Sequence, residues 1–243
     1  MKSPHGFSLI EMAFVLVIVT LLLGGLLVPF TTQVEQKRIA ETQKAMEEIK
    51  EALLGYAVAN GRLPCPVKDL PPMSGDAPPP PCANVAGFLP YSTLGVSRAD
   101  AWGRLYRYAV SANFTTTTAF ALPTYNSSGI CLTSCATIVV KTRDSSVGAT
   151  ALTNGAVAVV ISFGKNGYGG YSANGSPVAP LTDTTSDEYA NATLGSPFFS
   201  RTQTGPRPSC KDGTANPCEF DDLLTWLSPN VLFNRMVAAG KLP

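Results

Sequence analysis

Residues Phe7 to Phe30, FSLIEMAFVLVIVTLLLGGLLVPF, decide the fold, because they form one apolar run with a single charge, Glu11. A helix of about 24 residues rises about 1.5 Å per residue, so it is long enough to span a hydrocarbon core of about 30 Å. No other run in the chain of 243 residues approaches that length. The sequence therefore predicts one transmembrane helix segment over residues 7–30.

The position of Glu11 inside this run requires an explanation. A carboxylate several residues inside an apolar span costs a few kcal/mol unless it is paired, so it is by default functional. An ordinary secretory signal has an apolar region of about 7–15 residues followed by a small-residue cleavage site, and here the run is longer and no such site follows it. An ordinary signal anchor is the alternative, but it has no use for Glu11.

The segment Gly6-Phe7-Ser8-Leu9-Ile10-Glu11 resembles the prepilin signature of type IV pilins and type II secretion pseudopilins. The resemblance implies that a prepilin peptidase removes the leader, residues 1–6, by cleaving after Gly6, and then methylates the new amino terminus, Phe7. It also implies that Glu11 pairs with the amine of Phe7 in a neighbouring subunit. That pairing would neutralise both charges inside a filament and set its axial register.

Residues 31–60 continue the helix beyond the apolar run, since they are rich in helix-forming residues. Ile39, Met46 and Leu53 recur at intervals of seven residues, which indicates an amphipathic face that packs on a globular head. A short independent coiled coil is the alternative. Asn60-Gly61 is a plausible end for the helix.

The remaining residues, 61–243, are expected to form a periplasmic head of the α+β class. The region from Arg62 to Pro90 is proline-rich and predicts loop. Alternating and β-branched residues predict half-buried antiparallel strands at Leu105–Val110, Thr116–Leu122, Ile138–Thr142 and Ala156–Ser162. Two helices are predicted near the end, a short one over Phe220–Leu227 and a second one with Ser228 as its cap, Pro229 as its first residue and Gly240 beyond its end.

Three further segments are similar to those of major pseudopilins: Asp100-Ala101-Trp102-Gly103 with Tyr106 and Tyr108, Ser162 to Gly170, and Asp221-Asp222 before Trp226. They imply the family's head, in which an antiparallel sheet packs on the carboxyl half of the long helix. The chain departs from that family in its greater length and its six cysteines. These departures favour a large minor pilin or an atypical pseudopilin.

The six cysteines favour disulfides outside the cytoplasm. Their spacing lacks a CxxC pair, so a zinc site is a poor match. About 15 pairings exist for six cysteines, and we favour the sequential one. The alternative is reduced thiols in a cytoplasmic protein, which the membrane segment argues against. The expected disulfides are Cys65–Cys82, Cys131–Cys135 and Cys210–Cys218.

Catalytic chemistry is largely missing from the sequence. The one histidine, His5, lies in the leader, so the mature chain would lack imidazole for a catalytic triad or a metal site. A phosphate-binding loop motif is also missing. With 18 basic and 17 acidic residues, the chain has no basic excess that would indicate a nucleic acid partner. We therefore expect no enzyme activity and no organic cofactor.

Calcium is the one cofactor that the resemblance suggests, because major pseudopilins bind it in a carboxylate-rich loop after the sheet. Clustered carboxylates and loop carbonyls suit this ion, although the EF-hand spacing is absent. The alternative is a solvated acidic loop. The candidate ligands are Asp183, Asp187, Glu188, Asp221 and Asp222.

Together these features predict a structural subunit, a minor one, of a type IV pilus-like filament or a type II secretion pseudopilus. Its expected partners are the prepilin peptidase and other pilin or pseudopilin subunits that contact its amino-terminal helix. The subunit would start as a single-pass protein of the bacterial inner membrane with its head in the periplasm, and would then enter a periplasmic pseudopilus or a cell-surface pilus. The alternative function is a membrane-anchored periplasmic binding module or adhesin that does not polymerise.

Overall fold

The computed structural model describes residues 8–68, 74–116, 136–143, 148–180, 183–212, 214 and 216–241, with the backbone alone for residues 22–30. The leader, Gly6 and Phe7 lie outside the described residues. The chain divides into two compact units, residues 1–40 and residues 41–243. The division falls inside the predicted amphipathic segment 31–60.

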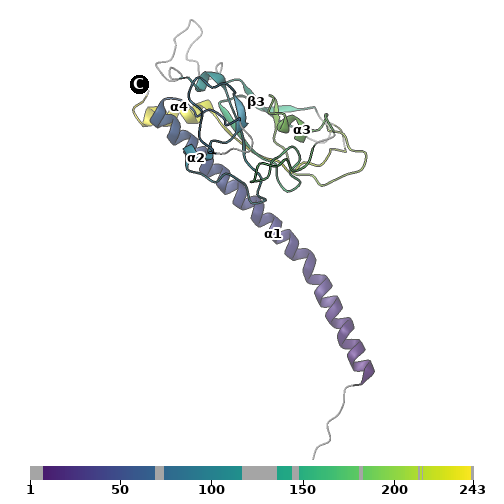
Figure 1. Ribbon diagram of the computed structural model, residues 1–243. Coiled ribbons are helices and arrows are strands. Elements are labelled where there is room, and N and C mark those ends of the chain that lie inside the picture. Colours follow the sequence, from purple (N-terminus) through teal and green to yellow (C-terminus); the bar gives the residue numbers. More distant parts are fainter. Residues whose placement is uncertain are drawn as a thin grey trace, which may run out of the picture. The chain divides into compact units, whose positions relative to one another are not determined.

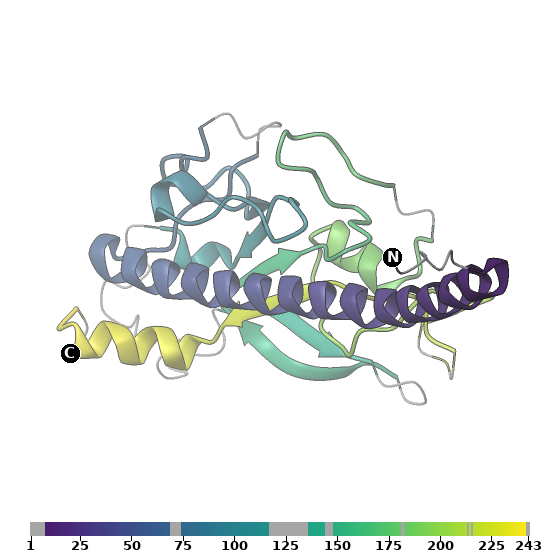
Figure 2. The ribbon, with the colours of Figure 1, turned by 90° about the horizontal axis from the view of Figure 1, so that it is seen from below.

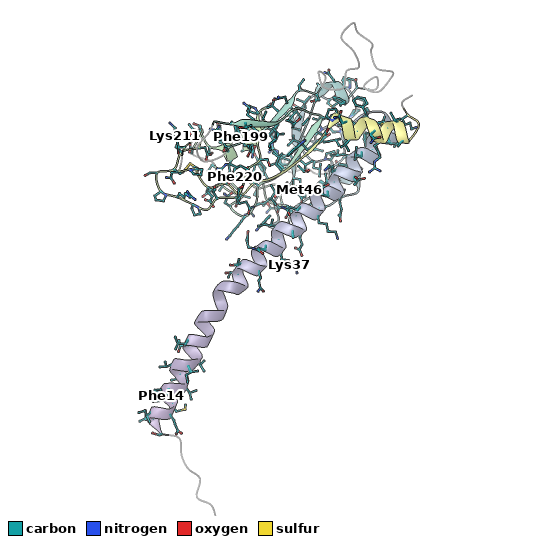
Figure 3. All side chains as sticks on the ribbon, turned by 180° about the vertical axis from the view of Figure 1, so that it is seen from behind. Phe14, Lys37, Met46, Phe199, Lys211 and Phe220 are labelled. Atoms are coloured by element: carbon teal, nitrogen blue, oxygen red, sulfur yellow. A yellow bond between two sulfur atoms is a disulfide. The ribbon has the colours of Figure 1, made fainter. Side chains whose placement is uncertain are left out.

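Helix α1 (Leu9–Asn60) runs without a break through 52 residues (Figure 1). In the first unit its apolar side chains are exposed, as Phe14 illustrates with 64% of its surface accessible (Figure 3). The predicted membrane segment 7–30 lies partly outside the described residues. Among the helical residues that are described with their side chains, no stretch is long and apolar enough to cross a membrane.

In the second unit, the carboxyl-terminal part of α1 is amphipathic, as the heptad spacing predicts. Met46, Ile49 and Leu53 are buried in one core cluster. The helix ends at Asn60, and Gly61 adopts a positive φ of 66° while its N–H donates to the carbonyl of Ala57 at 2.8 Å. The predicted helix end at Asn60-Gly61 is therefore confirmed.

A four-stranded antiparallel sheet packs against this face of α1 (Figure 2). Its order is β1 (Ala86–Phe88), β2 (Arg107–Val110), β5 (Ala158–Ser162) and β7 (Leu223–Leu227). Ala158 and Val160 of β5 join the same core cluster as α1. The sheet therefore packs its first face on the helix.

A second, three-stranded sheet covers the other face, in the order β4 (Thr150–Ala156), β3 (Ile138–Thr142) and β6 (Phe198–Phe199). Strand β3 pairs with β4 antiparallel and with β6 parallel. Val159 and Ile161 of β5 share a core with Val140 and Phe198 of this sheet. Because side chains alternate along a strand, β5 is buried on both sides and forms the centre of the head.

Short helices complete the head: α2 (Tyr91–Leu94), the 3-10 turn η1 (Ala112–Phe114), α3 (Asp187–Ala192) and α4 (Pro229–Ala238). The predicted carboxyl-terminal helix is confirmed as α4, with Pro229 in its first turn and Gly240 beyond its end at a φ of 66°. Leu232 and Met236 dock α4 on the core shared with α1. Val231 of the same helix is 46% exposed.

The predicted helix over Phe220–Leu227 is wrong, because this segment contains strand β7, which pairs with β5. Leu223 and Leu227 face the core shared with α1, whereas Leu224 and Trp226 face the second core. A strand with apolar residues on both faces reads as a continuous apolar run, which periodicity alone does not separate from a helix. The predicted strand at Thr116–Leu122 lies outside the described residues from residue 117 onward.

The turn that contains Asp100 ties α1 to the sheet. One carboxylate oxygen of Asp100 accepts hydrogen bonds from the backbone N–H groups of Trp102 at 2.9 Å and Arg104 at 2.8 Å. Its other oxygen accepts from the hydroxyl of Ser162, at the end of β5, at 2.6 Å. The adjacent Ala101 N–H donates to Thr42 of α1 at 3.2 Å. The segment Asp100 to Gly103 thus acts as a structural clamp.

We predict that Asp100→Ala lowers the free energy of unfolding of the full-length chain by about 2 kcal/mol, because it leaves the fully buried Ser162 hydroxyl without this acceptor. The matched control is Ser97→Ala, which removes an exposed hydroxyl in the same loop and should change the free energy by less than about 0.5 kcal/mol. Urea denaturation measures both values. Equal values for the two variants would contradict the clamp.

Candidate cation site

Three acidic side chains from two segments converge at one end of the head. Glu188 lies in the first turn of α3, and Asp221 and Asp222 directly precede β7. One carboxylate oxygen from each lies within 4.8 Å of the others. We call these three residues the carboxylate cluster. Among the residues that the structure describes, it is the only group of three metal-ligating side chains this close together.

The glycine-rich segment after β5 holds the cluster in place. Asn166 donates its backbone N–H to Asp221 Oδ2 at 2.7 Å and its side-chain amide to Glu188 Oε1 at 3.0 Å. The same Glu188 oxygen accepts the backbone N–H of Asp221 at 2.9 Å. Gly164 has a φ of 53°, and a Cβ atom there would lie 2.4 Å from the carbonyl oxygen of Asp221. This glycine is therefore needed for the close approach of the two segments.

Two carboxylate oxygens of the cluster lack a hydrogen-bond donor. Asp222 is 3% exposed, and its Oδ2 accepts the side-chain amide of Asn191 at 2.9 Å, whereas its Oδ1 is buried without a partner. Oδ1 of Asp221 is also buried and unpartnered. Buried oxygens without donors are costly, and an all-oxygen set of anionic ligands is the type that hard divalent cations prefer. The residues present therefore fit such a cation.

The electrostatics of the cluster lead to the same interpretation. Burial, with a further contribution from Asp221 and Glu219, raises the pKa of Glu188 to about 7. Burial also raises the pKa of Asp221 to about 6, with Glu219 adding to the effect. The pKa of Asp222 lies well above its usual range because of burial first and the Glu188 charge second. Without a cation, the cluster resists full ionisation.

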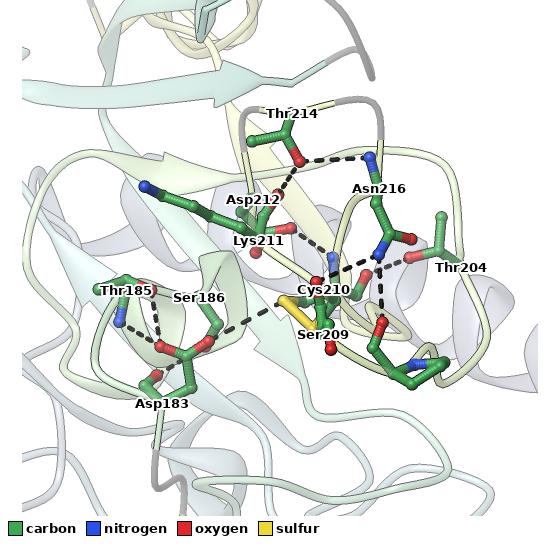
Figure 4. The surroundings of a disulfide bond; sticks show 12 residues. Asp183, Thr185, Ser186, Thr204, Ser209, Cys210, Lys211, Asp212, Thr214 and Asn216 are labelled. Carbon is green, nitrogen blue, oxygen red and sulfur yellow. Dashed lines mark hydrogen bonds between the residues drawn. A yellow bond between two sulfur atoms is a disulfide. The ribbon is translucent and has the colours of Figure 1, made fainter.

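The structure separates the other two predicted ligands from this cluster. Asp187 is buried between two arginines: its Oδ2 accepts from Arg201 Nε at 2.9 Å, and its Oδ1 forms an ion pair with Arg143 Nε at 2.9 Å that is not an aligned hydrogen bond. Asp183 accepts two hydrogen bonds from Thr185 in a surface turn (Figure 4). Of the five predicted ligands, the structure brings together Glu188, Asp221 and Asp222.

A cavity of about 410 Å³ reaches the cluster from the surface, since Glu188 forms part of its wall. Asp183 and Glu219 add acidic groups to the lining, and Arg207 adds a basic one. The Cys210–Cys218 disulfide lines the same cavity. The cavity thus offers a cation a largely acidic surface next to Glu188, the one member of the cluster that lines it.

Sequence analysis missed the two asparagines that hold the carboxylates. Asn166 lies inside the glycine-rich segment Ser162 to Gly170, which was noted for its resemblance to pseudopilins. The sequence therefore located this residue, but it did not indicate that Asn166 contacts the carboxylates. Asn191 follows Glu188 by three residues on α3, a spacing that puts both side chains on one helix face. That spacing was the one signal that could have identified it.

Two of the three predicted disulfides are present, Cys65–Cys82 and Cys210–Cys218. Cys131 and Cys135 lie outside the described residues. At the other end of the chain, Glu11 lies in the first turn of α1, where its Oε2 accepts the backbone N–H of Ser8 at 3.1 Å. This contact is one half of a capping box and begins the helix.

Comparison with known proteins identifies the amino terminus. Residues 1–27 match the family model for the prokaryotic N-terminal methylation motif. The chain therefore carries a prepilin-type signal, like those of type IV pilins and pseudopilins. No curated protein and no solved structure matches the chain.

The raised pKa values predict how the stability of the head depends on pH. The folded state holds the Glu188 proton up to about pH 7, whereas the unfolded chain releases it near pH 4.5. Stability is therefore greatest below pH 4.5 for this group and falls as the pH rises to 7, by up to about 1.4 kcal/mol per pH unit. Asp221 acts in the same direction.

Denaturation at pH 5 and pH 7.5, in a buffer with a chelator, measures this slope. Glu188→Gln should make the slope shallower, because the amide does not titrate. An unchanged slope in this variant would contradict the assignment of the raised pKa to Glu188.

Proposed function

We propose that this chain is a minor structural subunit of a type IV pilus-like filament or a type II secretion pseudopilus. The observation that carries the proposal is the N-terminal methylation motif over residues 1–27. It gives the chain a filament precursor's signal, and the continuous helix α1 that follows suits a subunit stem. The role is structural rather than catalytic.

In this proposal the precursor is inserted in the inner membrane with residues 7–30 as its anchor and its head in the periplasm. The two disulfides among the described residues of the head suit that oxidising compartment. The peptidase cleaves after Gly6 on the cytoplasmic side and methylates Phe7. Cleavage ahead of the apolar run leaves the anchor on the mature chain, so the same residues serve the membrane and the filament.

Glu11 sets the axial register in which neighbouring subunits assemble. It lies within an otherwise apolar surface that includes Leu9, Ile10 and Phe14, all more than half exposed. A lone carboxylate on such a surface is costly in an apolar filament core and gains by pairing with a positive amine. The methylated amine of Phe7 in the next subunit supplies that charge. A non-polymerising anchored binding module would leave Glu11 without this partner.

The intact mass of the membrane-extracted chain tests the processing step. Co-expression with a prepilin peptidase should remove Met1 to Gly6 and add one methyl group to Phe7. Gly6→Ala should abolish both changes, because a side chain at this position hinders entry of the extended leader into the protease site. A chain that keeps its leader with the peptidase present would favour an ordinary anchored binding module.

We also propose that the carboxylate cluster binds calcium. The observation that favours it is the pair of buried, unpartnered oxygens on Asp221 and Asp222, close to the Glu188 carboxylate. Calcium takes about six to eight oxygen ligands, so these carboxylates would supply part of its shell. The bound ion would neutralise their charge and join α3 to the segment that precedes β7. Its role is to stiffen the head.

Calcium should raise the melting temperature of the full-length chain at pH 7.5. At a concentration of about 100 times the dissociation constant, the stabilisation amounts to about 2.7 kcal/mol. Asp222→Asn should reduce the affinity about tenfold or more, because it removes a ligand charge from a buried position. The matched control is Asp76→Asn, which changes an exposed aspartate outside the cavity lining and should bind calcium like the unaltered chain. Equal losses in both variants would contradict the assignment of the site.

A further inference from the structure

The loop closed by the Cys210–Cys218 disulfide contains Asp212 (Figure 4), which belongs to a second group of buried charges. At its centre is Asp212, which is 7% exposed. Its Oδ1 accepts the backbone N–H of Cys218 at 2.9 Å, and its Oδ2 accepts the backbone N–H of Asp187 at 2.8 Å. One carboxylate thus ties the disulfide loop to the first residue of α3.

Arg201 completes this network. It donates from Nη2 to Asp212 Oδ1 at 2.9 Å and to the carbonyl oxygen of Cys218 at 3.1 Å, and from Nε to Asp187 Oδ2 at 2.9 Å. Its guanidinium also lies 4.5 Å from the centre of the Phe220 ring. Arg201 and Arg143 together offset the charges of Asp187 and Asp212. This network is therefore internally compensated and is not itself a cation site.

Both segments that carry the carboxylate cluster begin at this network. On one side, Asp187 is followed by Glu188, and Asn191 of the same helix donates to Asp222 at 2.9 Å. On the other side, Cys218 leads through Glu219 and Phe220 to Asp221 and Asp222. The contact of Asp212 with α3 and Cys218 therefore contributes to the distance between Glu188 and the two aspartates, together with the direct contacts made by Asn166 and Asn191.

The disulfide restrains the loop that contains Asp212, because it joins residues separated by eight positions. Asp212 contacts Cys218 at the end of this loop and Asp187 of α3 outside it. A cross-link across a short loop limits the conformations that the loop would otherwise sample. Opening the disulfide removes this restraint and leaves β5 and β7 paired, since that pairing uses backbone bonds from Ala158 to Ser162.

We infer that the Cys210–Cys218 loop is a clip that positions the carboxylate cluster for its cation, with Asp212 as the positioning residue. The inference rests on the proposed calcium site and adds a redox requirement to it. Calcium binds tightly when the disulfide is formed and weakly when it is reduced. A subunit would thus acquire its stiffened head only after a disulfide exchange partner in the periplasm has taken two electrons and two protons from the thiols of Cys210 and Cys218.

Calorimetric titration of the full-length chain in detergent with calcium chloride tests the clip. The paired substitution Cys210→Ser with Cys218→Ser should raise the dissociation constant about tenfold or more, the size seen when outer partners of a metal site are lost. The matched control is Cys65→Ser with Cys82→Ser, which opens the other described disulfide. It should lower the melting temperature but leave the dissociation constant within about twofold, because that disulfide makes no contact with the cluster.

Variants of Asp212 distinguish an effect on the position of the carboxylate cluster from an effect on the stability of the head. They also test the clip if the cysteine variant does not fold. Asp212→Ala should weaken calcium binding about as much as the loss of the disulfide. Asp212→Asn keeps an oxygen acceptor and should recover part of the affinity, even where both variants melt at the same temperature. Unaltered affinity in the cysteine variant and in Asp212→Ala would overturn the clip alone. An oxidised, unaltered chain that binds no calcium would overturn the calcium proposal and the clip together.

Discussion

The burial of one face of α1 against the central sheet is the interaction on which the rest of the head depends. Ile49 and Leu53 share a core with Tyr108 of β2 and Val160 of β5, and all four side chains are almost fully buried. From Leu9 to Leu21 the side chains of the same helix are exposed and mostly apolar, as Leu9 and Phe14 show. One continuous helix thus has two kinds of surface. One part has an apolar stripe that is buried in the head, and the other part has apolar side chains exposed around the helix.

The candidate cation site follows from the register of that sheet. Antiparallel pairing sets Ser162 of β5 opposite Leu223 of β7. The residues that follow β5 therefore meet the residues that precede β7, which places Gly164 and Asn166 against Asp221. Neither segment forms the site alone. A shift of the register by one residue would turn Asp222 away from Asn191 and Glu188, because successive side chains of a strand point to opposite faces.

Local sequence patterns predicted an element correctly where a single pattern specifies that element. The heptad spacing of Met46 and Leu53, the Asn60-Gly61 stop, and Pro229 at the start of α4 all predicted their elements correctly. The sequential pairing of Cys65 with Cys82 and of Cys210 with Cys218 was also predictable. In these cases the residues that form the predictive pattern lie close together in sequence.

The failures arise where tertiary contacts decide. Strand β7 was taken for a helix because both of its faces are buried, which removes the alternation that identifies a strand. Asp187 and Glu188 are neighbours in sequence, yet the first pairs with Arg201 and the second joins the carboxylate cluster. The placement of Arg201 and Arg143, from other segments of the chain, separates their roles. The resemblance therefore indicated five candidate ligands without dividing them.

Assembly of the apolar stem with other subunits, with Glu11 setting the contact, can be tested directly. A photo-crosslinking residue replaces Val17, which is 56% exposed on α1, in cells that express the processing peptidase and the partner subunits. We expect crosslinks from the stem to the stem of a neighbouring pilin-like subunit, and their loss in Glu11→Gln. Crosslinks to lipid alone, or the same subunit crosslinks in Glu11→Gln, would contradict it.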